Sequence, residues 1–111
     1  MHFFFSTEPN APPSYVTLSI RSSTSIMVQW SYVPAADQNG IILSYTVTYT
    51  ALPGGSPQMK LVNAPTTRAT LTGLNEHTDY SVTVFASTVK GDGNVSEPLT
   101  IRTEEDSKFS N

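Results

Sequence analysis

The sequence predicts an all-β domain in which two antiparallel sheets pack face to face. Apolar residues alternate with polar ones along several short runs, whereas the period of an amphipathic helix is nowhere convincing. Clusters of proline, glycine and asparagine separate these runs at short intervals. Each run has one apolar face that must be buried, so seven short strands of this kind predict a β-sandwich.

The first three predicted strands show the alternation most clearly. Residues 16–20 place Val, Leu and Ile at every second position, and residues 26–30 place Ile, Val and Trp in the same way. Residues 45–50 alternate Tyr, Val and Tyr with three threonines, which suit strands better than helices. Each of these segments therefore presents one apolar side to a core.

The last four predicted strands differ in length. "MKLV" at 59–62 is a weak strand, and residues 69–71 carry only the pair Ala and Leu. Residues 80–87 form the longest alternation of the chain, and residues 99–101 close the series with Leu and Ile. The connecting segments "VPAADQNG", "LPGGSP" and "KGDGN" are rich in turn-forming residues.

We expect the folded domain to occupy about residues 9–103. Residues 1–8 carry no pattern and are interpreted as an unstructured leader or as residues added to the native chain. Residues 104–111 are acidic and polar, like the start of a linker. The apolar start "MHFFF" is too short for the hydrophobic region of a signal peptide and lacks its basic flank. We therefore expect a piece of a longer protein whose targeting signal lies elsewhere.

Composition excludes several kinds of partner. The net charge is -3 and the six Lys and Arg residues are scattered, so no row of phosphates can be neutralised and nucleic acid is not expected as a partner. No apolar run could span a bilayer, so we expect no direct membrane insertion. The chain has no cysteine, which excludes disulfides and thiolate metal sites, and we expect no cofactor.

A set of spaced residues resembles the pattern of fibronectin type III domains. That pattern joins a proline-rich start, a Trp ending the second strand, "NG" before a Tyr-x-Val-x-Tyr strand, and Leu-x5-Tyr. A Gly-x-Gly-x-x-Ser-x-Pro turn and a terminal Thr follow. The matching residues here are Pro12, Pro13, Trp30, Asn39, Gly40, Tyr45, Val47, Tyr49, Leu74, Tyr80, Gly91, Gly93, Ser96, Pro98 and Thr103. The resemblance covers nearly the whole chain and implies a seven-stranded, immunoglobulin-like antiparallel sandwich without a disulfide.

The expected core residues combine the alternation with this resemblance. Trp30 is expected to fill the space between the sheets, and its indole N–H to need an acceptor. Tyr80, six residues after Leu74, fits the tyrosine corner of such sandwiches, in which the hydroxyl bonds to upstream backbone. The core residues are therefore predicted to include Trp30, Tyr45, Val47, Leu74, Tyr80 and Val82.

Catalysis is not expected. Ser, His and Asp all occur, but the Gly-x-Ser-x-Gly turn of a nucleophile elbow is absent. His77 lies in the turn "NEHTD", and no cluster of polar residues is visible around it that would make it a general base. Two isolated histidines do not form a metal site. We predict that the chain is not an enzyme.

The triplet Lys90-Gly91-Asp92 differs by one conservative change from Arg-Gly-Asp, through which many adhesion proteins bind integrins. Family members commonly carry a Gly-x-Gly pair at the positions of Gly91 and Gly93. We therefore interpret the loop mainly as a turn whose glycines supply positive φ. Lys90 and Asp92 are left as candidate partner contacts at an exposed tip, although Lys lacks the planar fork of Arg.

Two further candidates lie outside the triplet. Asn94-Val95-Ser96 is an N-glycosylation sequon, so Asn94 is a possible glycosylation site if the protein passes through the secretory pathway. Phe85 is expected on an outer sheet face beside Thr46, Thr48 and Thr83. It would be either a partner contact or an isolated apolar residue covered by its neighbours.

The resemblance implies an extracellular spacer and protein-interaction module, belonging to a multidomain cell-surface receptor or adhesion protein. Its partners would be an unidentified protein and the neighbouring domains of the same chain, and the isolated module is expected to be a monomer. Two alternatives remain, because such modules also act as spacers in cytoplasmic scaffold or muscle-type proteins and in secreted carbohydrate-active enzymes.

Overall fold

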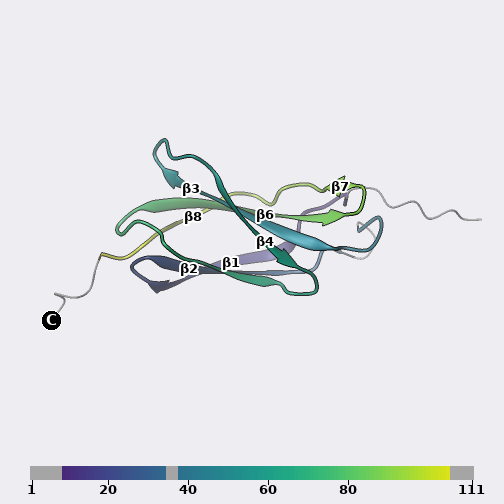
Figure 1. Ribbon diagram of the computed structural model, residues 1–111, viewed down its shortest axis with the longest axis horizontal. Helices are drawn as coiled ribbons and strands as arrows, with labels where there is room; N and C mark the ends of the chain where they lie inside the picture. Colours follow the sequence, from purple (N-terminus) through teal and green to yellow (C-terminus); the bar gives the residue numbers. More distant parts are fainter. Residues whose placement is uncertain (1–8, 35–37, 106–111) are drawn as a thin grey trace, which may run out of the picture.

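The computed structural model describes residues 9–34 and 38–105 of the chain. The leader at 1–8 and all but the first two residues of the predicted linker lie outside these residues. In the described part every regular element is a β-strand, and the strands form two antiparallel sheets that face each other (Figure 1). The predicted all-β sandwich is therefore confirmed.

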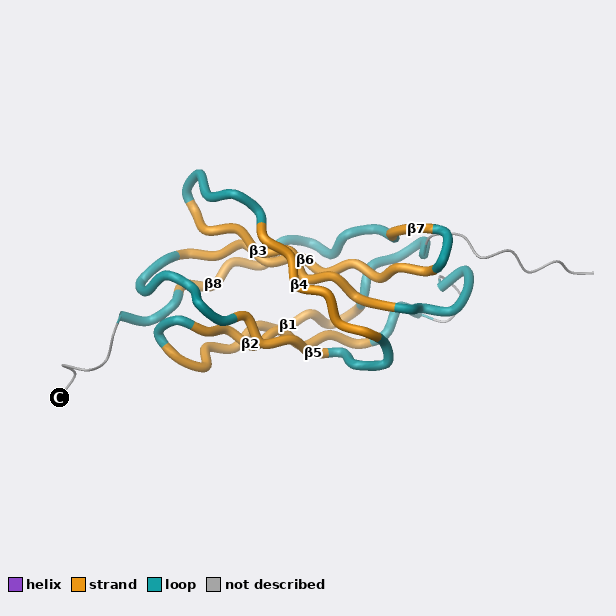
Figure 2. Tube along the Cα trace, viewed as in Figure 1, coloured by secondary structure: helices purple, strands orange, loops and turns teal. Residues whose placement is uncertain are grey.

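The smaller sheet holds three strands in the order β1 (Ser14–Ser22), β2 (Ser25–Ser31) and β5 (Arg68–Leu71). The larger sheet is built on β6 (Asp79–Thr88), which pairs with β3 (Ser44–Leu52) along one edge. β4 (Gln58–Asn63) extends the sheet beyond β3. β7 (Gly91–Asp92) and β8 (Leu99–Arg102) both pair with β6, and Figure 2 shows the two layers with loops at both ends.

The structure has eight strands where seven are predicted. The additional strand is β7, which lies in the segment "KGDGN" predicted as a turn, whereas the last predicted strand, at 99–101, is β8. Between β7 and β8 the chain still runs beside β6: Gly93 N donates to Ala86 O at 2.8 Å and Ser96 N donates to Val84 O at 2.9 Å. The hydroxyl of Ser96 accepts from Val84 N at 2.8 Å, replacing a backbone carbonyl in the ladder. A side chain therefore substitutes for backbone pairing between β7 and β8, so this edge strand of the sheet is divided into two short pieces.

The core lies between the sheets and includes every predicted core residue. Trp30 is 5% exposed and Tyr45 is fully buried; their ring centroids lie 5.4 Å apart at an interplanar angle of 57°. The space is thus filled by this aromatic pair and not by Trp30 alone. The buried apolar residues are Ile26, Val28, Trp30, Val33, Tyr45, Val47, Ala69, Leu71, Leu74, Tyr80, Val82, Val84 and Ala86.

The buried aromatic residues Tyr80, Trp30 and Tyr45 differ in whether their polar atoms are paired. Tyr80 Oη accepts a hydrogen bond from Asn75 N at 2.8 Å, the upstream backbone bond of a tyrosine corner. The indole N–H of Trp30, for which we expected an acceptor, has no hydrogen-bond partner in the described protein, and neither has Tyr45 Oη. Burial of an unpaired polar group costs free energy, so these two atoms require an explanation.

The chain enters and leaves the sandwich at opposite ends. Pro9 is buried beside Gly93, at the end of the sandwich that carries β7 (Figure 1). At the other end Thr103 is buried, its hydroxyl donates to Asn75 O at 2.7 Å, and Thr78 N donates to that hydroxyl at 3.0 Å. Both ends of the domain are thus fixed to the body of the fold by packing or hydrogen bonds.

Candidate functional site

The residues considered for catalysis are not brought together. His77 is exposed in the turn before β6, with Nδ1 3.7 Å from a carboxylate oxygen of Glu105. Within residues 9–34 and 38–105, no group of three His, Cys, Asp or Glu residues could hold a metal ion. His77 therefore has the surroundings of an exposed turn residue.

The triplet Lys90-Gly91-Asp92 is divided between a turn and a strand. Thr88 pairs with Gly91, so only Val89 and Lys90 form the turn between β6 and β7. Asp92 lies in β7 opposite Ser87, whose hydroxyl donates to its carboxylate at 2.7 Å. Lys90 is exposed at the tip, whereas Asp92 is exposed but tied to the neighbouring strand. The two charges are therefore not presented together at the tip, contrary to the expectation from sequence.

Glycine is needed at positions 91 and 93 for different physical reasons. Gly91 has a φ of +144°, a conformation that side-chain-bearing residues rarely adopt. Gly93 does not share this feature; a Cβ placed on it would lie 2.8 Å from a side-chain atom of Pro9. The expectation of positive φ is thus met at Gly91, while Gly93 allows the incoming chain to pack closely against this edge.

Asn94 is exposed, and its side-chain Nδ2 donates to the backbone carbonyl of Asn10. The third residue of the sequon, Ser96, is buried and bonded to β6 as described above. The bond to β6 therefore explains why a serine stands at position 96 without any role in glycosylation. Asn94 is exposed, so a glycosylating enzyme could reach it. A glycan there would lie beside the segment through which the chain enters the domain.

Phe85 lies in a row of side chains across the outer face of the larger sheet. It is half-buried and pairs across the strands with Thr46, which in turn pairs with Leu61. Leu61 is 62% exposed, yet Thr46 between its two large neighbours is only 6% exposed. Thr46 was expected on the outer face and lies there, but it is covered, because it is short and both flanking side chains are long.

The neighbouring row of the same face extends the weakly polar surface. Thr48 pairs with Thr83 on β6 and with Met59 on β4, and Met59 is 69% exposed. None of the four side chains Met59, Leu61, Phe85 and Thr83 is charged. Phe85 therefore belongs to a larger apolar and threonine-rich face.

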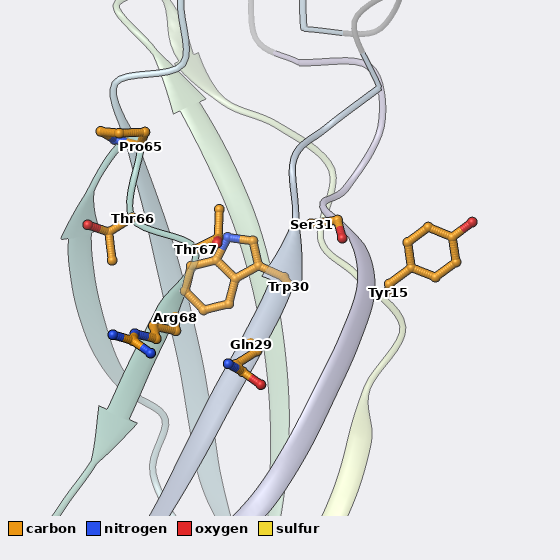
Figure 3. Close-up of a pocket in the computed structure, with 8 residues that line it drawn as sticks. All are labelled: Tyr15, Gln29, Trp30, Ser31, Pro65, Thr66, Thr67 and Arg68. Atoms are coloured by element: carbon orange, nitrogen blue, oxygen red, sulfur yellow. The ribbon is translucent and has the colours of Figure 1, made fainter.

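A pocket that was not predicted from the sequence lies at the end of the smaller sheet. Its volume is about 600 Å³, and Figure 3 shows the side chains around it. Tyr15, at its edge, has a left-handed φ of 53°, lies in an irregular pairing of β1 with β2, and is 84% exposed. Its side chain points away from the others (Figure 3). The lining residues are Tyr15, Gln29, Trp30, Ser31, Pro65, Thr66, Thr67 and Arg68.

A strained backbone at a bulky residue is uncommon and must be stabilised by its surroundings. Here an irregularity in the pairing re-aims an aromatic side chain into solvent, which is a known use of β-bulges near functional sites. Alternation alone places residue 15 on one face of a regular strand, so the displacement was not predictable from the sequence.

The clearest electrostatic feature is an ion pair at the opposite end. Arg102 on β8 donates from Nε and an Nη atom to the two carboxylate oxygens of Asp79 on β6, at 2.8 and 3.1 Å. The hydrogen bond from Arg102 holds the pKa of Asp79 below its ordinary value, and Asp79 raises the pKa of Arg102. These residues face each other across the strands, so the pair joins β6 and β8.

Comparison with known proteins agrees with this architecture. The family model described as "Fibronectin type III domain" matches residues 11–102. This chain is a fibronectin type III domain. It is 42% identical over 101 residues to protein sidekick-1 of Gallus gallus and 43% identical over 101 residues to receptor-type tyrosine-protein phosphatase F of Danio rerio. Each match covers 88% of this chain but only 5% of the relative.

Solved structures show the same fibronectin type III fold. The FN1–FN3 domains of chicken CNTN1 match with a TM-score of 0.81 and 25% identity, over 89% of this chain and 33% of that one. The FN5 domain of Drosophila Lar matches with a TM-score of 0.71 and 30% identity, over 85% of this chain and 98% of that one. Fibronectin type III domains are a non-catalytic fold.

Proposed function

We propose that this fibronectin type III domain is a non-catalytic spacer and protein-recognition module in the extracellular part of a multidomain cell-surface receptor or adhesion protein. The observation that carries the proposal is the path of the chain, which enters at the β7 end and leaves at the other, each end fixed to the fold. A domain of this kind holds its two neighbours apart at a defined separation.

Two further observations support a role in recognition. The larger sheet presents an uncharged outer face around Phe85 and Leu61, and the β7 end carries exposed loops with Lys90 at a turn. Rigid sandwiches commonly carry their binding residues on such loops and faces. The relatives include a receptor-type protein of which a matching domain forms a small part. The described residues contain no helix long and apolar enough to cross a membrane.

The localisation is tested in the full-length protein on living cells. An amine-reactive label that does not cross membranes should modify the exposed Lys60 and Lys90 without permeabilisation. Peptide N-glycosidase should lower the mass of the peptide containing Asn94, and Asn94→Gln should abolish that shift. Labelling only after permeabilisation would identify a cytoplasmic scaffold or muscle-type protein. Recovery from the medium, joined to a carbohydrate-active domain, would identify the secreted alternative.

Asn94→Gln is also a control for the fold. Gln keeps an amide side chain but removes the sequon, so the domain should keep its strands. The hydrogen bond from Asn94 to the Asn10 carbonyl involves only an exposed side chain, so its loss should change stability by no more than about 0.5 kcal/mol. If the mass changes and the melting temperature does not, the variant has lost the glycan without any loss of fold stability.

A further inference from the structure

Strand β4 forms one edge of the larger sheet and pairs only with β3 among the residues that the structure describes. The pairing is unbroken over all six residues of β4, with no bulge and no proline. In an antiparallel ladder, successive residues direct their N–H and C=O groups alternately to the two sides of the strand. Half of the backbone groups of β4 therefore point away from β3, where the described protein places no further strand.

The other three sheet edges are each protected against further pairing. On β1 the pairing with β2 is irregular at two places, and β5 has only four residues. Beyond β6 the edge is divided into β7 and β8, and Pro9 packs closely against Gly93 there. Bulges, short strands and covering segments are devices by which proteins close sheet edges. β4 is regular and five of its six residues are exposed, so its edge is open to an added strand.

The two sides of β4 differ in chemistry. Met59 and Leu61 lie on the outer face of the sheet and are 69% and 62% exposed. Lys60 lies on the other side, because it pairs with Val47, whose side chain is buried in the core. Lys60 is exposed at the edge and makes no ion pair with a described residue. Along the edge, one cationic side chain thus stands between two apolar ones.

These side chains determine which strand fits the edge. Directly opposite residues of neighbouring strands point to the same side of a sheet, so cross-strand pairs decide the fit. Residues opposite Met59 and Leu61 would continue the uncharged outer face, where apolar side chains gain apolar neighbours. The residue between them would lie opposite Lys60, where a carboxylate is attracted and another lysine is repelled. The complementary strand therefore has the pattern apolar, acidic, apolar.

A second copy of this chain fits the edge less well. Two β4 strands can pair antiparallel so that each Met59 lies opposite the Leu61 of the other copy, but the two Lys60 side chains then lie opposite each other. Like charges at directly opposite positions are destabilising. A lysine on an exposed edge is also a common protection against self-association. The charge of Lys60 therefore disfavours self-pairing and favours an acidic partner strand.

We propose that an extended segment of a protein partner, with an Asp or Glu between two apolar residues, adds a strand to the larger sheet along β4. In this mode of recognition, backbone hydrogen bonds supply affinity and alternate side chains supply specificity. The acidic residue pairs with Lys60, and the apolar residues pack beside Met59 and Leu61. The extracellular setting of this partner rests on the function proposed above, whereas the chemistry of strand addition does not.

The test uses the 111-residue chain and two capped synthetic peptides that differ in one residue, Thr-Val-Glu-Val-Thr and Thr-Val-Lys-Val-Thr. Each peptide is titrated into ¹⁵N-labelled protein while amide shifts are followed by NMR. We expect the Glu peptide to shift the amides of β4 and to bind about fivefold more tightly than the Lys peptide, the effect of one cross-strand charge pair. Alternate amides of β4, those directed away from β3, should also exchange more slowly with solvent when it is bound.

The variant Lys60→Glu should reverse the preference, so that the Lys peptide binds more tightly. Lys90→Glu is the matched control, because it makes the same change of charge at an exposed residue in the turn between β6 and β7, and it should keep the original preference. The Glu peptide with its three central amides N-methylated cannot donate the backbone hydrogen bonds and should not bind. The amide spectra themselves report whether each variant is folded.

Absence of binding by either peptide, equal affinity for the two, or shifts that avoid β4 would overturn the proposal. A preference that is unchanged in Lys60→Glu, or binding of the N-methylated peptide, would do the same. Shifts of the β4 amides with protein concentration alone would mean that a second copy occupies the edge, which also contradicts the proposal. Because these measurements use the domain and peptides in solution, they are independent of the cell-labelling experiment, and failure of either proposal can be recognised separately.

Discussion

Replacing the hydroxyl-bearing ring of Tyr80 or Tyr45 by phenylalanine is expected to have opposite effects on stability. The two side chains are 3% and 0% exposed, so neither substitution changes ring packing or opens a cavity of note. Tyr80→Phe removes the acceptor of Asn75 N and should cost about 1–3 kcal/mol. Asn75 is exposed, so water can partly replace the lost bond and the cost should fall in the lower half of that range.

Tyr45→Phe removes a hydroxyl that has no partner in the described protein. The native state then no longer buries an unpaired polar group, so stability should stay unchanged or rise by up to about 1 kcal/mol. For a domain of this size each kcal/mol moves the melting temperature by about 4–8 °C, which separates the two variants clearly.

The measurement is equilibrium unfolding in urea, followed by the fluorescence of Trp30, the only tryptophan, and by circular dichroism. Coincident transitions from the two probes establish two-state unfolding, and unchanged slopes show that only stability has changed. The reasoning is refuted if Tyr80→Phe is as stable as the wild type. It is also refuted if Tyr45→Phe costs as much as Tyr80→Phe, because Tyr45 Oη must then have a partner.

Two further predictions concern the ends of the sandwich. Because the hydrogen bond from Arg102 lowers the pKa of Asp79 in the folded state, the pair stabilises the fold above the ordinary carboxyl pKa of about 4, and this contribution is lost as the pH falls through the lowered value. As the pH falls through the acid range, the melting temperature of Asp79→Asn should therefore fall less than that of the wild type. Parallel plots of melting temperature against pH for the two proteins would contradict this. Gly93→Val should lower the melting temperature more than Lys90→Ser, because a Cβ at 93 meets Pro9; an equal effect would show that this contact is unimportant.

The sequence predicted the strands well because alternation reports which side of each strand is buried. Tyr45, Val47, Tyr80 and Val82 all lie where that rule places them. The rule describes a strand by itself, however, and the exposure of Thr46 depends on the lengths of Leu61 and Phe85 on two other strands. The outward orientation of Thr46 was therefore predictable from the sequence, whereas its burial beneath neighbouring side chains was not.

Features that depend on irregular backbone escaped prediction for a related reason. The division of the edge strand into β7 and β8 depends on the Ser96 hydroxyl taking the place of a carbonyl beside Val84, and the exposure of Tyr15 depends on an irregular pairing of β1 with β2. Both features arise between strands, and periodicity within one strand carries no information about them.

The unpaired hydroxyl of Tyr45 illustrates the limit most sharply. By alternation alone Tyr45 and Tyr80 are alike, since each is an inward-facing tyrosine, and only the spacing of Tyr80 from Leu74 distinguishes them in the sequence. Tyr80 is satisfied because the turn after Leu74 brings a backbone N–H to it, whereas no donor or acceptor of the described chain reaches Tyr45. Pro65, which has no N–H to donate, lines the pocket that includes Trp30 and a second pocket that includes Tyr45. Whether a buried hydroxyl is paired is therefore decided by the turns that reach it from outside its own strand, so two tyrosines with the same alternation can differ in this respect.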